Sequence, residues 1–126
     1  MVVRSSNVVR VHLFALGSRG SPRPPRVDVD IEIDPNGLVV VTEPPTGGST
    51  FADRAVMRRL RLTGHLHRLP AGSFLGDEMA VVADGSDVGG PHSPSHHTIS
   101  PSKPITYERF AELYLKLPWQ YWGVQR

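Results

Sequence analysis

The sequence has 126 residues, of which 39% are hydrophobic and 21% are charged, and this composition is typical of one globular domain. The formal net charge is only +2, which does not by itself indicate a nucleic-acid partner. No cysteine is present, so the sequence excludes a disulfide framework, a thiolate zinc site and a cysteine nucleophile.

The N-terminal stretch, residues 8–16, is rich in β-branched and aromatic residues and predicts a strand. Arg10 and His12 interrupt its apolar character, so we expect no cleavable signal peptide. No apolar run approaches the roughly 18 residues of a membrane helix, so we also expect no membrane span.

A loop dense in Gly, Pro and Arg follows at residues 17–26. Its arginines offer planar donor groups that suit phosphate or carboxylate, although a solvated basic loop is the alternative. Residues 27–33, VDVDIEI, alternate strictly and predict a half-buried strand whose three carboxylates face solvent. A turn is expected at Asp34, and residues 38–41 form a second apolar segment that either completes a hairpin or leads into the next turn.

The segment 47–61, GGSTFADRAVMRRLR, combines a glycine turn with a basic helix. Thr50 is a suitable N-cap, because its hydroxyl can accept a bond from an unpaired backbone N–H. A helix N-terminus carries partial positive charge, so this turn is where we expect a phosphate-bearing ligand. A capped helix without any ligand is the alternative.

The second half of the chain continues with strands expected near residues 65–69, 79–83 and 95–100, with a long loop at 84–94. Thr106 then predicts the cap of a helix that runs to about Leu117. Its apolar residues lie on one helical stripe, as core packing requires: Phe110, Leu113, Tyr114 and Leu117. Strands interspersed with short helices indicate an α+β fold.

Six histidines are many for this length and leave two kinds of chemistry open. One is a zinc site built from His65, His67 and one histidine of the segment 92–97. The other is a metal-free ribonuclease, in which two histidines act as general base and acid and an arginine binds phosphate. The helical H-E-x-x-H signature is missing and no spacing specifies either option, so we expect no metal site.

Three blocks of sequence together resemble one known family. They are the TGGSTFADRAVMRR segment from Thr46 to Arg59, the LPAG segment from Leu69 to Gly72, and HHTISPSKP from His96 to Pro104. In this order and at these separations they resemble the type VI secretion exported effector two (Tse-two) toxin family, whose fold is similar to that of ADP-ribosyltransferases.

The resemblance implies an ADP-ribosyltransferase-like single domain over residues 1–126, with a motif-bearing core at about 26–117. The expected architecture is a compact α+β domain with a twisted, mainly antiparallel split sheet and two or three short helices. The implied function is that of a cytotoxic effector, an NAD-dependent ADP-ribosyltransferase or NAD glycohydrolase, with a cognate immunity protein and an unidentified ADP-ribose acceptor. The chain would reside in the cytoplasm, or be delivered into that of a target cell, and nucleic acid is not expected as a partner.

By resemblance, Ser49, Thr50 and His96 are the catalytic residues, and Arg26, Arg54 and Gly48 bind the cofactor. Related chains carry an arginine two residues after a leucine of the first strand, whereas this sequence has Leu13-Phe14-Ala15. No glutamate has motif support for the contact to the ribose. These departures favour, as one alternative, a non-catalytic interaction domain of the same fold, and the histidines leave a ribonuclease-type toxin as the other.

Overall fold

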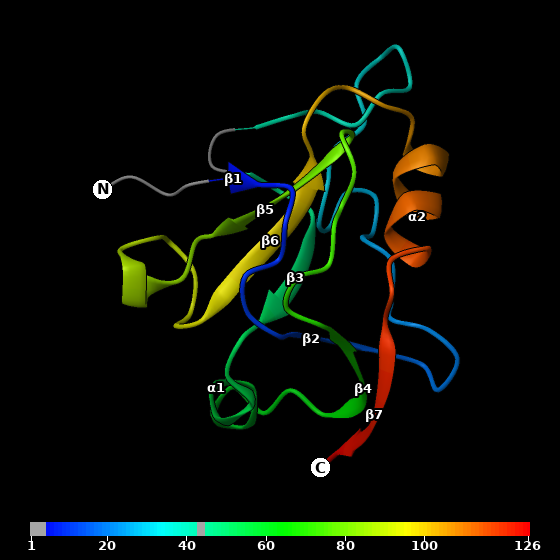
Figure 1. Ribbon diagram of the computed structural model, residues 1–126. Helices are drawn as coiled ribbons and strands as arrows, with labels where there is room; N and C mark the ends of the chain where they lie inside the picture. Colours follow the sequence, from blue (N-terminus) through cyan, green and yellow to red (C-terminus); the bar gives the residue numbers. More distant parts are fainter. Residues whose placement is uncertain (1–4, 43–44) are drawn as a thin grey trace.

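The strands of the described residues form one antiparallel sheet in the computed structural model, which describes residues 5–42 and 45–126 (Figure 1). The strand order is β1-β5-β6-β3-β2-β4-β7, and every pair is antiparallel. The bounds are β1 Ser5–Ser6, β2 Leu13–Gly17, β3 Gly48–Phe51, β4 Gly64–Leu69, β5 Met79–Ala83, β6 His96–Pro101 and β7 Gln120–Gln125.

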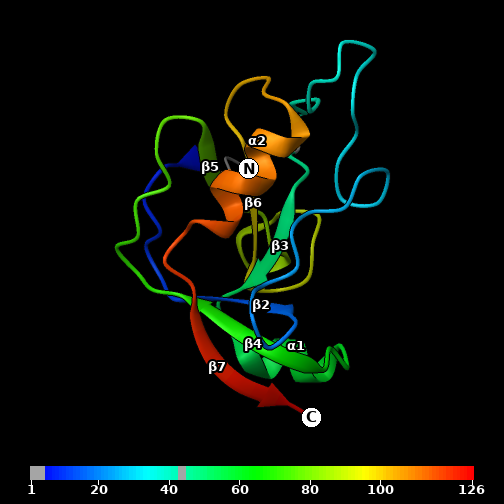
Figure 2. The same cartoon turned by 90° about the vertical axis from the view of Figure 1, so that its right-hand side faces the viewer.

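The junction between β2 and β3 divides this sheet into two parts. Only one register pair, Phe14 with Phe51, joins these two strands, whereas β2 and β4 share five pairs. Figure 2 shows β2 and β4 running across the direction of β3. The predicted α+β class and the mainly antiparallel sheet are therefore confirmed, and the predicted split exists only as this narrow junction within a continuous sheet.

Two short α-helices accompany the sheet, α1 at Arg54–Arg59 and α2 at Tyr107–Leu115, together with a 3₁₀ turn at Ser86–Val88. As predicted, Thr106 caps α2, because its hydroxyl accepts a hydrogen bond of 3.2 Å from the backbone N–H of Arg109. None of the described helices is both long and apolar enough to cross a membrane.

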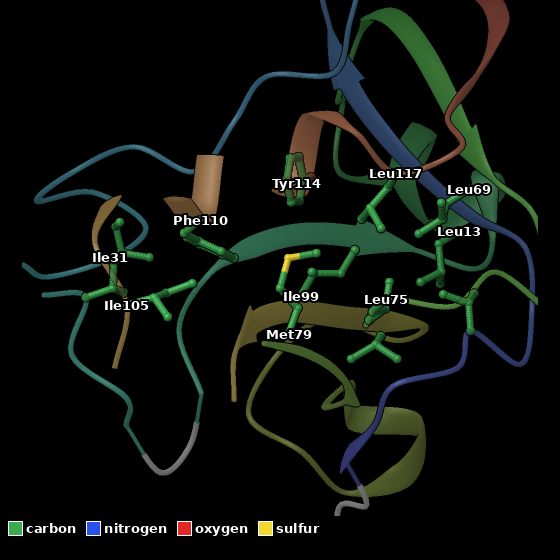
Figure 3. Packing of buried hydrophobic residues seen from close by; sticks show 13 residues of the cluster. Leu13, Ile31, Leu69, Leu75, Met79, Ile99, Ile105, Phe110, Tyr114 and Leu117 are labelled. Carbon is green, nitrogen blue, oxygen red and sulfur yellow. The ribbon is translucent and has the colours of Figure 1, made fainter. Parts of the chain in front are cut away.

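The main hydrophobic core lies between α2 and the sheet, where the predicted helical stripe packs (Figure 3). Phe110 is fully buried and Tyr114 is only 1% exposed. A smaller cluster fills the space under α1 and consists of Phe14, Phe51, Val56, Met57 and Leu66. The core-facing stripe of α2 is confirmed. Helix α1 packs instead against residues of β2, β3 and β4.

The strand predicted at residues 27–33 is wrong. This segment consists of turns and isolated bridges, and Asp28 has a φ of 63°, a left-handed conformation outside the range of regular strands. The carboxylate of Asp30 accepts a hydrogen bond of 2.7 Å from the backbone N–H of Arg26 and so stabilises a local turn. Short acidic side chains compete with strand pairing in this way, and Val29 is left 65% exposed.

Two further strands, β2 and β7, also differ from the expectation. The strand predicted at residues 8–16 begins only at Leu13, because the preceding residues follow an irregular path with a single bridge from Val8 to Phe74. The C-terminal strand β7 was not predicted. The other three predicted strands are confirmed within one residue as β4, β5 and β6.

Candidate functional site

A cavity of about 440 Å³ opens between the turn-rich segment around residues 23–30 and the face of β3 and β6. This volume falls in the range of about 300–1,000 Å³ that is usual for small-molecule sites. The residues that line it are Ala15, Leu16, Arg23, Pro25, Arg26, Asp30, Gly48, Ser49, Phe51, Met57, Leu60, Leu62, His92, Ser93, His96 and Tyr114.

Four of the six residues predicted for the site line this cavity: Arg26, Gly48, Ser49 and His96. They come from three segments that are far apart in the sequence. The pairing of β3 with β6 brings two of these segments together, because Ser49 pairs with Thr98 and Phe51 pairs with His96. Directly paired residues of antiparallel strands project to the same face, so Ser49 and His96 share one face of the sheet.

Thr50 does not line the cavity, and its predicted role as an N-cap is wrong. It lies within β3, is fully buried, and donates a hydrogen bond of 2.9 Å from its hydroxyl to the carbonyl of His97. The N-cap of α1 is Asp53, whose carboxylate accepts from the backbone N–H of Ala55. The phosphate site expected at a helix start on Thr50 is therefore not formed, because strand pairing uses this residue instead.

Arg54 also lies outside the cavity lining. Its guanidinium carbon is 5.8 Å from the centroid of the Phe14 ring, a cation–π contact. Its Nε is buried and has no hydrogen-bond partner among the described residues. Arg54 therefore contacts the small hydrophobic cluster under α1 rather than the cavity.

A buried carboxylate, Asp84, bonds to two residues on the β3–β6 side of the cavity. It is 1% exposed, and its Oδ1 accepts a hydrogen bond of 2.6 Å from Nδ1 of His96. Its Oδ2 accepts from the hydroxyl of Thr98. His92 stacks on His96 with 4.3 Å between ring centroids, and its Nε2 lies 3.7 Å from Oδ2 of Asp84.

Local backbone packing explains why Asp84 occupies this position. It follows β5 directly, and its backbone N–H and carbonyl bond to the carbonyl of His96 and the N–H of His92. The loop after it passes close by, because a Cβ on Gly90 would lie 2.2 Å from the carbonyl oxygen of Asp84. Only glycine permits this approach, which folds His92 back over the carboxylate.

The charge state of Asp84 follows from these contacts. Burial alone would raise the pKa of this carboxyl, but the hydrogen bonds from His96 and Thr98 and the nearby imidazoles lower it below its ordinary value of 3.8. Asp84 is therefore ionised at neutral pH. An ionised carboxylate can only accept, so it selects the His96 tautomer with the proton on Nδ1 and a lone pair on Nε2.

This arrangement gives His96 the orientation of a general base. A carboxylate that holds Nδ1–H of an imidazole leaves Nε2 free to remove a proton from a hydroxyl or a water. The edge of the Phe51 ring packs against His96 with 5.1 Å between centroids and further restricts the imidazole. Ser49 and Ser93 line the same cavity and bring hydroxyl groups into it.

Asp84, His92 and His96 also form the one group of possible metal ligands among the described residues, with one ligand atom of each within 4.8 Å of the others. Two imidazoles and a carboxylate are a known zinc ligand set. A cation would have to displace the hydrogen bond between Asp84 and His96, so the present geometry is that of a dyad. The zinc ligand set considered from sequence is not formed, because His65 bonds to the Tyr121 hydroxyl and His67 to the Ser18 carbonyl.

The opposite wall of the cavity is basic and exposed. Nε of Arg26 donates to Oδ2 of Asp30 at 3.1 Å, whereas Arg23 has no ion pair among the described residues. No glutamate lines the cavity, and Asp30 is its only lining carboxylate. The transferase-type glutamate therefore has no counterpart in the described lining.

No sequence motif assigned a role in a site to Asp84 or Tyr114. A signal for Asp84 exists, since it is a polar residue directly after the apolar strand β5. Tyr114 fits the core stripe of α2 so well that nothing in the sequence distinguishes it from a packing residue.

A comparison of the chain with protein families, curated proteins and solved structures finds no match.

Proposed function

We propose that the cavity binds NAD and that the protein transfers or releases ADP-ribose, as a toxin-type domain does. One observation carries the proposal. Arg26, Gly48, Ser49 and His96 were selected from the sequence as cofactor-binding and catalytic residues, and all four line a single cavity. Sheet pairing brings Gly48, Ser49 and His96 together, and Arg26 reaches the same cavity from a separate loop.

The chemistry of NAD fits the two walls. Its pyrophosphate suits the guanidinium groups of Arg23 and Arg26, which bind anionic oxygens through charge-assisted hydrogen bonds. Its nicotinamide ribose then lies toward Ser49 and His96. Ser49 is exposed and can donate its hydroxyl proton to a ribose oxygen.

The reaction breaks the bond between the ribose C1′ and the nicotinamide nitrogen, and nicotinamide leaves as a neutral molecule. Positive charge develops on the ribose as this bond breaks, so a nearby anion stabilises the transition state. A water or an acceptor hydroxyl then attacks C1′, and Nε2 of His96 takes its proton. Asp84 supplies the negative charge behind the resulting imidazolium, because it is hydrogen-bonded to Nδ1.

A ribonuclease-type toxin is the second candidate, because His92, His96 and two arginines line the same cavity. The stacking of the two rings, with 25° between their planes, disfavours it. A general base and a general acid for in-line displacement at phosphorus act from opposite sides of the phosphate. Two imidazoles stacked on one side do not meet that requirement without rearrangement.

A non-catalytic interaction domain is the third candidate, and Ala15 supports it. Ala15 is 3% exposed and lines the cavity at the position where related toxins carry an arginine. Without that cation, retention of the fold for binding another protein is the simplest alternative to catalysis.

The test is calorimetric binding of NAD to the purified protein, followed by measurement of nicotinamide release. We expect wild type to bind NAD, Arg26→Ala to bind it at least several-fold more weakly, and His96→Ala to bind it but release no nicotinamide. Arg19→Ala is the matched control, because Arg19 is an exposed arginine of the same loop that does not line the cavity.

Absence of NAD binding at millimolar concentration would overturn the proposal. RNA cleavage by wild type, lost in His96→Ala and independent of NAD, would then favour the second candidate. If wild type neither binds NAD nor cleaves RNA, the interaction domain is the remaining candidate. Growth arrest on expression in a bacterial cytoplasm, absent for His96→Ala, tests the toxin part separately.

A further inference from the structure

Tyr114 is a core tyrosine whose hydroxyl has no hydrogen bond among the described residues, although the residue is only 1% exposed. Its ring packs against Phe110 and Trp119, at centroid distances of 6.3 and 5.3 Å. The hydroxyl oxygen is not among the buried side-chain atoms that lack a partner, which are Nε of Arg54 and Oε1 of Gln125. It is therefore accessible from the cavity that Tyr114 lines, and it is free to bond to a ligand there.

The hydroxyl lies at the floor of the cavity, against Gly48. A Cβ built on Gly48 would be 2.9 Å from the Tyr114 hydroxyl oxygen and 2.6 Å from its ring. Both residues belong to the cavity lining. Because Gly48 has no side chain, the phenol reaches a space that any other residue in β3 would fill.

The groups around this hydroxyl define what it can bind. Asp30 and Arg23 are the charged residues that act on it, with opposite effects on its pKa. Burial is the largest effect and raises the pKa of Tyr114 far above its ordinary value of 10.0. The phenol is therefore protonated at every working pH and can donate to an acceptor oxygen.

The two arginines of this wall are not equivalent. The charge of Arg26 is paired with Asp30, at 3.1 Å, whereas Arg23 has no ion pair among the described residues. The position of Arg23 is still fixed, because its backbone N–H donates to the carbonyl of Leu16 at 3.0 Å. Arg23 therefore contributes an unneutralised positive charge to the cavity that the Tyr114 hydroxyl also lines.

We propose that the Tyr114 hydroxyl and the Arg23 guanidinium together form the subsite for the diphosphate of the dinucleotide. This inference rests on the proposed function and assigns two residues that the sequence motifs did not include. A protonated phenol and a free guanidinium are both donors, and together they match an anionic oxygen rather than a ribose hydroxyl or an amide N–H.

Calorimetry of wild type, Tyr114→Phe and Arg23→Ala with NAD and with ADP-ribose tests the subsite. We expect each variant to bind both ligands about tenfold more weakly, since hydrogen bonds to charged groups are the stronger class. The thermal midpoint of Tyr114→Phe should stay unchanged or rise, because the removed hydroxyl has no partner in the free protein.

Tyr121→Phe is the matched control. It removes a hydroxyl that bonds to His65 outside the cavity, so the affinity for both ligands should equal that of wild type. Nicotinamide release provides a second readout. Because the subsite does not touch the reacting bond, saturating NAD should restore the rate of Tyr114→Phe to that of wild type.

The possible failures are distinguishable. If wild type binds NAD and Tyr114→Phe binds it equally well, this inference is overturned and the proposed function stands. A clear fall in the thermal midpoint of Tyr114→Phe would also overturn it, because the hydroxyl would then have a partner in the free protein. If wild type binds neither NAD nor ADP-ribose at millimolar concentration, both proposals fail.

Discussion

The two walls of the cavity are built in opposite ways. On the β3–β6 wall, Asp84 is buried and both of its oxygens accept hydrogen bonds, from His96 and from Thr98. On the arginine wall, Arg26 and Asp30 form an ion pair at a half-exposed turn. The first wall is held by sheet pairing and burial, and the second by a local turn.

Under the proposed function, this difference would assign the chemistry to the β3–β6 wall and ligand binding to the arginine wall. A general base must be held in one orientation, and a buried, fully satisfied network provides this. An anion-binding wall can adjust to its ligand, because exposed arginines carry long and mobile side chains. We therefore expect substitutions on the β3–β6 wall to alter stability strongly, and those on the arginine wall to alter mainly affinity.

The largest effect should come from Asp84→Ala. It leaves the Nδ1–H of His96 and the hydroxyl of Thr98 buried without their acceptor. The expected loss is about 3 kcal/mol of unfolding free energy, which corresponds to a fall of roughly 10 °C in the thermal midpoint. Surface substitutions are expected to shift the thermal midpoint by on the order of 2 °C. A midpoint of Asp84→Ala that close to the midpoint of wild type would contradict the expected difference in stability between the two walls.

Gly48→Ala should have the next largest effect, because it tests where the two walls meet. The new Cβ would lie 2.6 Å from the Tyr114 ring, which is itself packed in the core. Overpacking of this kind is destabilising by about 1–3 kcal/mol, measured by chemical denaturation. Gly20→Ala is the control, since a Cβ there meets nothing within 4 Å. Equal stability of the two variants would contradict the close packing at Gly48.

The sequence predicted the elements whose pattern is local. The helix capped by Thr106 was predictable because its cap and its apolar stripe lie within one segment. Strand β5 was predictable because a short apolar run between turns has few alternatives. Of the six site residues predicted by the resemblance, Arg26, Gly48, Ser49 and His96 line one cavity, and their roles stay predictions.

The failures concern residues whose partners are distant in sequence or whose side chains bond locally. Thr50 matched an N-cap, but its hydroxyl bonds to His97, 47 residues away, because β3 pairs with β6. The alternation at residues 27–33 matched a strand, but Asp30 bonds back to Arg26. Asp84 was missed because its role depends on tertiary contacts with His96 and Thr98.

The dependence of stability on pH is the third test, and a smaller effect is expected. The folded-state pKa of Asp84 lies below its ordinary value of 3.8, so its contribution is fully present above pH 3.8 and is lost as the pH falls through the folded-state value. The hydrogen bond from Arg109 lowers the pKa of Glu78 as well, from 4.5. Denaturation from pH 6 to pH 2 should therefore show a falling unfolding free energy.

Two variants separate these contributions. Asp84→Asn should flatten the acid limb, because it removes a group that releases its proton on folding. Glu78→Gln should change the limb only slightly, since its ion pair with Arg109 is at the surface. An acid limb in Asp84→Asn as steep as that of wild type would show that folding does not lower the pKa of Asp84.

The smallest effect on stability should come from Asp30→Asn on the arginine wall. The substitution removes the charge paired with Arg26 but keeps an oxygen that can accept from the Arg26 backbone N–H. Because exposed ion pairs contribute little, the unfolding free energy should change by less than about 1 kcal/mol. Affinity for NAD should rise, since Arg26 then becomes a second unneutralised cation beside Arg23. A loss of stability as large as that of Asp84→Ala would mean that both walls are rigid, and ligand binding would then have to fit the arginines as they stand.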